Sequence, residues 1–238
     1  STISVQNSSL FPPRLIIPTL LLATTTTEDL LEGNIGCGKT SVLKHIAAQH
    51  GYTGDYEQDI WKPKIPDQSS LNLIVSPEPL TRWTSVGPAH VNLLNQMYSD
   101  PSRNGFVFEH YSQYTRFDQM RSIFYEHIDE DECGGRKTIH LLGGPYSPIG
   151  SALWRTFIRG KMIRDVRNHV INRVYFLCSG KIHKAEYAIL DEWFKYLMTR
   201  PECQINKFIY LRTSPQTVYD RIQKRARSED ELIPLVSF

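Results

Sequence analysis

The chain has 238 residues, of which 40% are hydrophobic and 22% are charged. That size and mix predict one globular domain with a full core and exclude a chain that is disordered throughout. Lysine and arginine number 27 against 25 acidic residues, and the net charge of +2 gives no bulk electrostatic reason to expect nucleic acid or a membrane surface as a partner. Any phosphate binding must therefore be local.

The cysteines are widely spaced and form neither a Cys-x-x-Cys pair nor a His/Cys cluster of zinc spacing. We therefore expect reduced thiols in an intracellular protein, cytoplasmic or mitochondrial, without a structural metal. The four cysteines are Cys37, Cys133, Cys178 and Cys203.

The first 27 residues differ in composition from the rest, with many Ser and Thr, no acidic residue and a single Arg14. The apolar stretch 15–23 is interrupted by Pro18 and is too short to span a bilayer. We predict a disordered segment or a transit peptide over 1–27, followed by one domain over 28–238.

A phosphate-binding loop is the first strong local signal. Residues 33–40, GNIGCGKT, fit G-x-x-x-x-G-K-T and run into a helical pattern. In such a loop the glycines let backbone N–H groups face a phosphate, Lys39 reaches the β and γ oxygens, and the Thr40 hydroxyl suits Mg²⁺. We predict that ATP phosphates bind Gly33, Asn34, Ile35, Gly36, Cys37, Gly38, Lys39 and Thr40.

The remaining elements predict an α/β fold, because strand patterns alternate with helical ones. This alternation predicts a mainly parallel sheet with helices on both faces. The strand expected just before the phosphate loop has a weak strand pattern, since TTTTEDLLE has only Leu30 and Leu31 as large apolar residues and contains Asp29. In chain order we predict a strand from 71 that ends at Glu78, helices over 88–99 and 109–128, a strand over 138–142, a turn-rich then basic stretch over 143–173, a helix over 185–198, a strand over 208–211 and a helix over 218–227.

Several segments together resemble the deoxynucleoside kinases, the family of the deoxycytidine, deoxyguanosine, mitochondrial thymidine and insect multisubstrate enzymes. They occur in the family's order and at roughly its spacing, and cover most of residues 32–235. They read EGNIGCGKT, EPLTRW, NLLNQMYSDPSR, FEHYSQYTR, SGKIHKAEYAILDEWFKYL and IYLRTSPQTVYDRIQKRARSEDELIPL. The resemblance implies a P-loop kinase-type sheet, ATP and Mg²⁺ as cofactors, a deoxyribonucleoside substrate in nucleotide salvage, and a homodimer.

The resemblance also implies roles for single residues. Glu78 resembles the general base that takes the proton of the sugar 5′-hydroxyl, and Lys39 contacts the transferred phosphate. The walls of the nucleoside pocket correspond to Trp83, Tyr98 and Phe108, the base-reading residues to Glu109 and Arg116, and the catalytic lid to Arg221, Arg225 and Arg227. Without the resemblance, these aromatic residues would be interpreted as core aromatics, Glu78 as a solvated glutamate, and the arginines of the lid as a solvated basic helix face.

The sequence departs from the family at three places. Glu109 replaces a Gln, which favours a base edge with two donors, such as guanine. Gly143 and Gly144 replace a Glu-Arg pair that would help hold magnesium and stabilise the reacting oxygens. The chain ends at Phe238, so we predict the family's sheet without its C-terminal strand and helix.

Three functions remain open at this point. The first is ATP-dependent phosphorylation of a deoxyribonucleoside 5′-hydroxyl. The second is a catalytically impaired, nucleotide-binding relic of the family, which the change at Gly143 and Gly144 would suit. The third is another small-molecule P-loop kinase, which would explain the phosphate loop but not EPLTRW or NLLNQMY.

Overall fold

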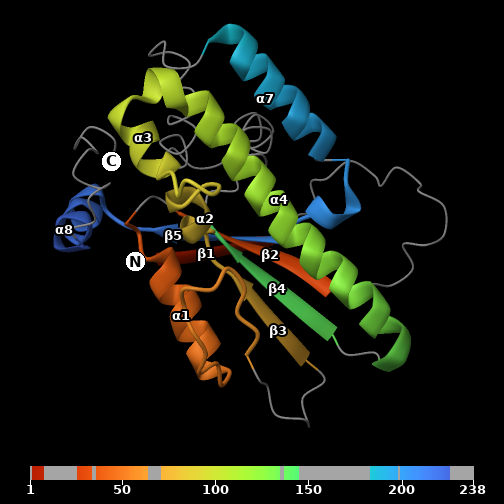
Figure 1. Ribbon diagram of the computed structural model, residues 1–238. Coiled ribbons are helices and arrows are strands. Elements are labelled where there is room, and N and C mark those ends of the chain that lie inside the picture. The colour runs from red at the N-terminus through yellow and green to blue at the C-terminus, as the bar shows by residue number, and fades with distance from the viewer. Residues whose placement is uncertain are drawn as a thin grey trace.

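A five-stranded sheet forms the centre of the molecule (Figure 1). The computed structural model describes residues 2–7, 26–33, 36–63, 71–134, 137–144, 183–197 and 199–225. The strand order is β1-β5-β2-β4-β3, in which β1 is antiparallel and the other strands are parallel. The strands are β1 (Thr2–Asn7), β2 (Thr26–Gly33), β3 (Leu71–Ser76), β4 (Lys137–Gly143) and β5 (Lys207–Arg212).

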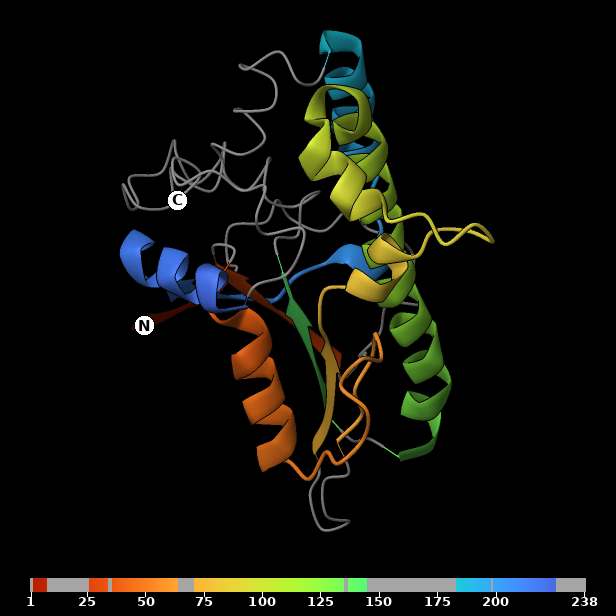
Figure 2. The ribbon, with the colours of Figure 1, turned by 60° about the vertical axis from the view of Figure 1, so that its left-hand side comes forward.

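Helices cover both faces of the sheet, which confirms the predicted α/β architecture. In Figure 2 the sheet is nearly edge-on, with α1 and α8 on one side and α4 and α7 on the other. None of the described helices is both long and apolar enough to cross a bilayer. The helices are α1 (Lys39–Gln49), α2 (Leu80–Thr84), α3 (Leu93–Ser99), α4 (Pro101–Gly134), α7 (Lys184–Leu197), the 3-10 helix η2 (Pro201–Cys203) and α8 (Pro215–Arg225).

Strand β2 lies in the middle of the sheet, between β5 and β4, although its sequence has few large apolar residues and a weak strand pattern. Its two buried carboxylates each have a basic neighbour on an adjacent strand. Glu28 Oε2 lies 2.6 Å from His140 Nδ1, and Asp29 Oδ2 lies 3.6 Å from Lys207 Nζ. Buried charges are tolerated when they are paired, so these contacts allow a polar segment to occupy a core strand.

The N-terminal segment contributes one strand to the sheet. Residues 2–7, which lie in the segment predicted to be disordered or a transit peptide, pair with β5 from Thr2 opposite Arg212 to Asn7 opposite Lys207. The physical reason is the outer edge of β5, whose backbone groups need partners, together with the β-prone sequence TISVQN. Residues 8–25 and 226–238 lie outside the described part of the chain.

Helix α4 also begins earlier than predicted. The sequence indicated a helix over 109–128, whereas α4 begins at Pro101. Asp100 Oδ1 accepts hydrogen bonds from the Arg103 N–H, at 3.2 Å, and from the Ser102 hydroxyl, and these bonds lower the pKa of Asp100. The Asp-Pro-Ser segment is therefore an N-cap signal followed by proline in the first turn.

Candidate active site

The phosphate loop joins the end of β2 to the start of α1, as the sequence predicted. Gly36 and Gly38 have φ of 72° and 107°, in the left-handed region that favours glycine. A Cβ on Gly36 would lie 2.9 Å from Ile222 Cγ1 of α8, so the loop passes directly under that helix. Gly38 is the N-cap of α1, whose N-terminal N–H groups favour an anion. Asn34 and Ile35 lie outside the described residues.

Lys39 is the first residue of α1 and lies largely buried at the base of the loop. Its Nζ donates to the Gly33 carbonyl at 2.8 Å and lies 4.0 Å from Glu78 Oε1. Lys39 follows β2 and Glu78 follows β3, so both side chains lie at the carboxyl edge of the parallel strands, where α/β proteins bind ligands. Thr40 is exposed in the first turn of α1.

Cys37 is buried within the loop, in surroundings that disfavour its thiolate. Burial raises the pKa of its thiol, against the lowering effect of the nearby Lys39 ammonium. The thiol therefore stays protonated at neutral pH, and it packs in the apolar cluster between the sheet and α1 and α8.

One of the predicted lid arginines contacts the phosphate loop. Arg221 Nη1 donates to the Cys37 carbonyl at 2.8 Å, and the Thr213 hydroxyl donates to the same oxygen at 3.2 Å. Arg225 is the last residue of α8 and is exposed. Arg227 lies outside the described residues, so its predicted role is not addressed.

The predicted nucleoside residues gather between α2, α3 and α4. Trp83 and Phe108 pack edge to face with ring centroids 5.4 Å apart, and Tyr98 packs against the same apolar cluster. The Arg116 guanidinium lies 4.9 Å from the centroid of the Trp83 ring. Glu109 is half-buried on α4, next to Phe108 in the chain. The structure thus brings the aromatic residues and Arg116 together, while their contact with a nucleoside remains a prediction.

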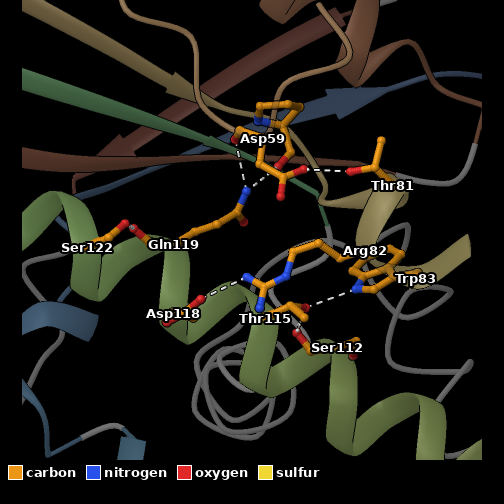
Figure 3. Close-up of polar contacts among 10 residues, drawn as sticks. Asp59, Thr81, Arg82, Trp83, Ser112, Thr115, Asp118, Gln119 and Ser122 are labelled. Carbon is orange, nitrogen blue, oxygen red and sulfur yellow. Dashed lines mark hydrogen bonds and ion pairs between the residues drawn. The ribbon is translucent and has the colours of Figure 1, made fainter. Parts of the chain in front are cut away.

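Helix α4 holds this region through polar contacts that the sequence did not indicate (Figure 3). Trp83 Nε1 donates to Thr115 Oγ1 at 2.9 Å, and Arg82 Nη1 lies 2.9 Å from Asp118 Oδ2. Thr115 and Asp118 stand three positions apart and therefore share one face of α4. That spacing is the only signal a sequence could offer, and it does not reveal the partners on α2.

Gln119 extends the same face of α4 towards Glu78. Its Nε2 donates to the Asp59 carbonyl at 2.9 Å and, at 3.4 Å, to the carbonyl of Pro77, the residue before Glu78. Asp59 in turn accepts a hydrogen bond from the Thr81 hydroxyl at 3.0 Å. The turn that carries Glu78 is therefore fixed to α4 on one side and to the loop before β3 on the other (Figure 3).

Comparison with known proteins agrees with this arrangement. A family model described as deoxynucleoside kinase matches residues 30–139 and 164–236. Mitochondrial thymidine kinase 2 of Macaca fascicularis is 26% identical over 205 residues, covering 86% of this chain and 57% of that protein. Deoxycytidine kinase 2 of Gallus gallus is 24% identical over 220 residues, covering 86% and 67%.

Mitochondrial deoxyguanosine kinase of Xenopus laevis is 22% identical over 218 residues, covering 86% of this chain and 66% of that protein. The chain thus spans less than three fifths of the length of the thymidine kinase it matches. The family model covers most of the chain and includes the phosphate loop from Gly33, Glu78 and the aromatic cluster on α2 to α4. The chain therefore belongs to the deoxynucleoside kinase family.

Proposed function

We propose that this chain transfers the γ-phosphoryl group of ATP to the 5′-hydroxyl of a deoxyribonucleoside, a reaction of nucleotide salvage. The observation that carries the proposal is the placement of the Glu78 carboxylate 4.0 Å from Lys39 of the phosphate loop. It puts a proton acceptor beside the group that would hold the reacting phosphate. The names of the relatives, which are thymidine, deoxycytidine and deoxyguanosine kinases, support the substrate class.

In this reaction Glu78 accepts the proton of the 5′-hydroxyl as that oxygen bonds to the γ-phosphorus. The bond from the γ-phosphorus to the bridging oxygen breaks, and ADP leaves with the electron pair. Lys39 and the N–H groups of the phosphate loop hold the β and γ oxygens throughout. Arg221, which lies on the loop through the Cys37 carbonyl, offsets negative charge on the transferred group.

Magnesium fits the oxygen groups available at this site. No cluster of three or more His, Cys, Asp or Glu that would hold a metal by protein groups alone occurs among the described residues. Mg²⁺ usually keeps several waters and binds one or two protein oxygens together with substrate phosphates. The Thr40 hydroxyl and the Glu78 carboxylate would supply such oxygens, and the ion would neutralise charge on the phosphates.

For the nucleoside we propose a pocket with Trp83, Tyr98 and Phe108 as its walls and with Glu109 and Arg116 as base-reading residues. The packing of Trp83 on Phe108 and of Arg116 on Trp83 supports this assignment. An ionised Glu109 only accepts hydrogen bonds, which suits a base edge with two donors, such as guanine. Glu109→Gln should therefore improve thymidine as a substrate relative to deoxyguanosine, and equal use of thymidine by both proteins would contradict the assignment.

We also propose a homodimer through the exposed faces of α7 and α4. Large apolar side chains are exposed there, at Tyr125 of α4 and at Ile189, Trp193 and Tyr196 of α7. Exposed apolar patches of this kind are typical of interaction sites. Trp193→Lys should convert a dimer to a monomer in light scattering, and an unchanged dimer mass would exclude this face.

We place the protein in the cytoplasm or the mitochondrion, since relatives with mitochondrial names are among those it matches.

The decisive experiment is phosphoryl transfer from labelled ATP and Mg²⁺ to thymidine, deoxycytidine, deoxyguanosine and deoxyadenosine, scored as 5′-monophosphate. We expect product, and we expect Lys39→Ala to reduce it by about 100-fold or more, because a charge-stabilising group is lost. Deoxyribonucleoside monophosphates serve as competing acceptors, and a preference for them would indicate a nucleotide kinase.

A second candidate function is nucleotide binding without transfer. It is favoured by Gly143 and Gly144, which leave the end of β4 without a carboxylate or a guanidinium. Intact ATP binding with no product for any acceptor would support this candidate over the kinase.

A further inference from the structure

Gly144 lies directly beneath the side chain of Glu78, in a backbone position that is well fixed. Its φ of 114° is in the left-handed region, and its N–H donates to the Leu31 carbonyl of β2 at 3.2 Å. A Cβ on Gly144 would lie 2.3 Å from Glu78 Cγ and 2.6 Å from Glu78 Oε1. Glu78 therefore occupies the volume that any side chain at position 144 would need.

This placement brings the Glu78 carboxylate to the ammonium of the phosphate loop. Glu78 Oε1 lies 4.0 Å from Lys39 Nζ, and the two side chains are 23% and 10% exposed. Opposite charges at this distance attract appreciably where water is partly excluded. Lys39 Nζ also donates to the Gly33 carbonyl, and Glu32, whose Oε2 accepts a bond from the Gly33 N–H, adds a second carboxylate to the loop.

The same carboxylate opposes a phosphate that arrives without a cation. A triphosphate must place its oxygens around Lys39, within reach of a negative charge that already attracts that ammonium. Mg²⁺ bound to the phosphates reverses the effect, because it brings positive charge towards Glu78. The balance between the two forms of ATP thus depends on where the Glu78 side chain lies.

We propose that Gly144 is a positioning residue that lets Glu78 lie against Lys39, and that Glu78 in this position makes ATP binding depend on Mg²⁺. The proposal rests on the proposed function only in taking ATP as the ligand of the phosphate loop. It assigns to Gly144, in place of the family's arginine, a role in selecting the metal-bound form of the nucleotide.

The test measures ATP binding by titration calorimetry, once with excess EDTA and once with excess Mg²⁺, and compares the two dissociation constants. Wild type should bind ATP more tightly with Mg²⁺. Glu78→Gln should strengthen binding of metal-free ATP by about threefold, the size expected for loss of a partly exposed charge contact. It should therefore reduce the preference for Mg²⁺.

Gly144→Ala should reduce the preference in the same direction without removing a charge, because the added Cβ displaces Glu78. The matched control is Gly87→Ala. Gly87 also has a positive φ, of 65°, but a Cβ there would meet nothing within 4 Å. It therefore introduces a side chain at a positive-φ glycine without any contact to Glu78, and its Mg²⁺ preference should equal that of wild type. Should Gly144→Ala fail to fold, Glu78→Gln decides the question.

The outcomes separate this inference from the proposed function. An unchanged Mg²⁺ preference in Glu78→Gln, with phosphoryl transfer by wild type intact, would overturn the inference alone. A reduced preference in both variants, with no transfer by wild type, would support the inference and overturn the kinase function. Absence of ATP binding under both conditions would overturn both.

Discussion

The two faces of the sheet are packed by different means. The face under α1 and α8 is an apolar cluster that includes Leu31, Leu43 and Trp61. The face under α4 has a smaller apolar cluster and a row of buried polar side chains that crosses three adjacent strands. Glu28 of β2, His140 of β4 and Ser76 of β3 form that row.

In this row His140 is fully buried and contacts a partner through each ring nitrogen. Its Nδ1 lies 2.6 Å from Glu28 Oε2, and its Nε2 lies 2.8 Å from Ser76 Oγ. Ser76 is the last residue of β3, two positions before Glu78. Beneath the phosphate loop the sheet is therefore packed mainly by apolar side chains, whereas a polar contact between His140 and Ser76 holds the strand end before the proposed base.

The largest expected effect comes from breaking the polar row. His140→Leu leaves the Glu28 carboxylate buried without its partner and should lower the free energy of unfolding by about 3–5 kcal/mol. Glu28→Leu/His140→Leu removes both partners and should lose less than His140→Leu alone. Urea unfolding of the three proteins measures the difference. A double variant less stable than the single one would show that the apolar replacement does not pack.

The second largest loss of unfolding free energy is expected from truncating a core side chain on the face of the sheet under α1 and α8. Leu43→Ala should cost about 3 kcal/mol, because it removes a buried side chain of α1 and leaves a cavity against Gly143. Val42→Ala, next to it on α1 and only half-buried, should cost clearly less in the same urea measurement. Equal losses would mean that α1 is not held by the packing described.

A smaller effect is expected where α4 holds α2. Thr115→Val removes the acceptor of the Trp83 indole N–H and should cost about 1–2 kcal/mol. Thr115→Ser keeps the hydroxyl and should recover most of the loss. Tryptophan fluorescence during unfolding follows both variants. An equal loss in both would contradict the assignment to the hydrogen bond, since Ser keeps the hydroxyl that Val lacks.

The smallest effect concerns Asp29, the other buried carboxylate of β2. Burial raises the pKa of Asp29, while Lys207 and Lys137 act in the opposite sense. Between its usual pKa and the raised one, the folded state holds a proton that the unfolded chain releases, so this group makes stability fall as pH rises. Asp29→Asn should flatten that fall in melting temperatures recorded from about pH 4 to pH 7. A steeper fall in Asp29→Asn would reverse the sign assigned to its burial.

Much of the fold could be predicted, because local patterns decided it. The strands β3, β4 and β5 and the helix α7 lie within a few residues of their predicted positions, since each has a clear period of 2 or 3.6. The position of β2 could not be assessed from its own sequence. Its carboxylates are acceptable only because His140 and Lys207, more than a hundred residues away in the chain, lie on the neighbouring strands.

In the candidate site, too, some features could be predicted from local sequence and others depend on residues distant in the chain. The phosphate loop and Glu78 follow from a short motif and a strand end, and the structure places them together. The sequence does not identify Gln119 and Gly144 as site residues, because their importance depends on their contacts. Gln119 donates to the Pro77 carbonyl, and Gly144 lies against the Glu78 side chain. Such contacts depend on tertiary packing and have no local signature.

The pairing of β1 with β5 has a consequence for folding kinetics. Its partners lie about 200 residues apart in sequence, so forming this ladder closes a very long loop. Contacts of such high sequence separation form late in folding, and edge strands open first in the native state. The backbone amides that β1 and β5 share should therefore exchange with deuterium faster than those between β2 and β4, through local opening that leaves the parallel sheet intact.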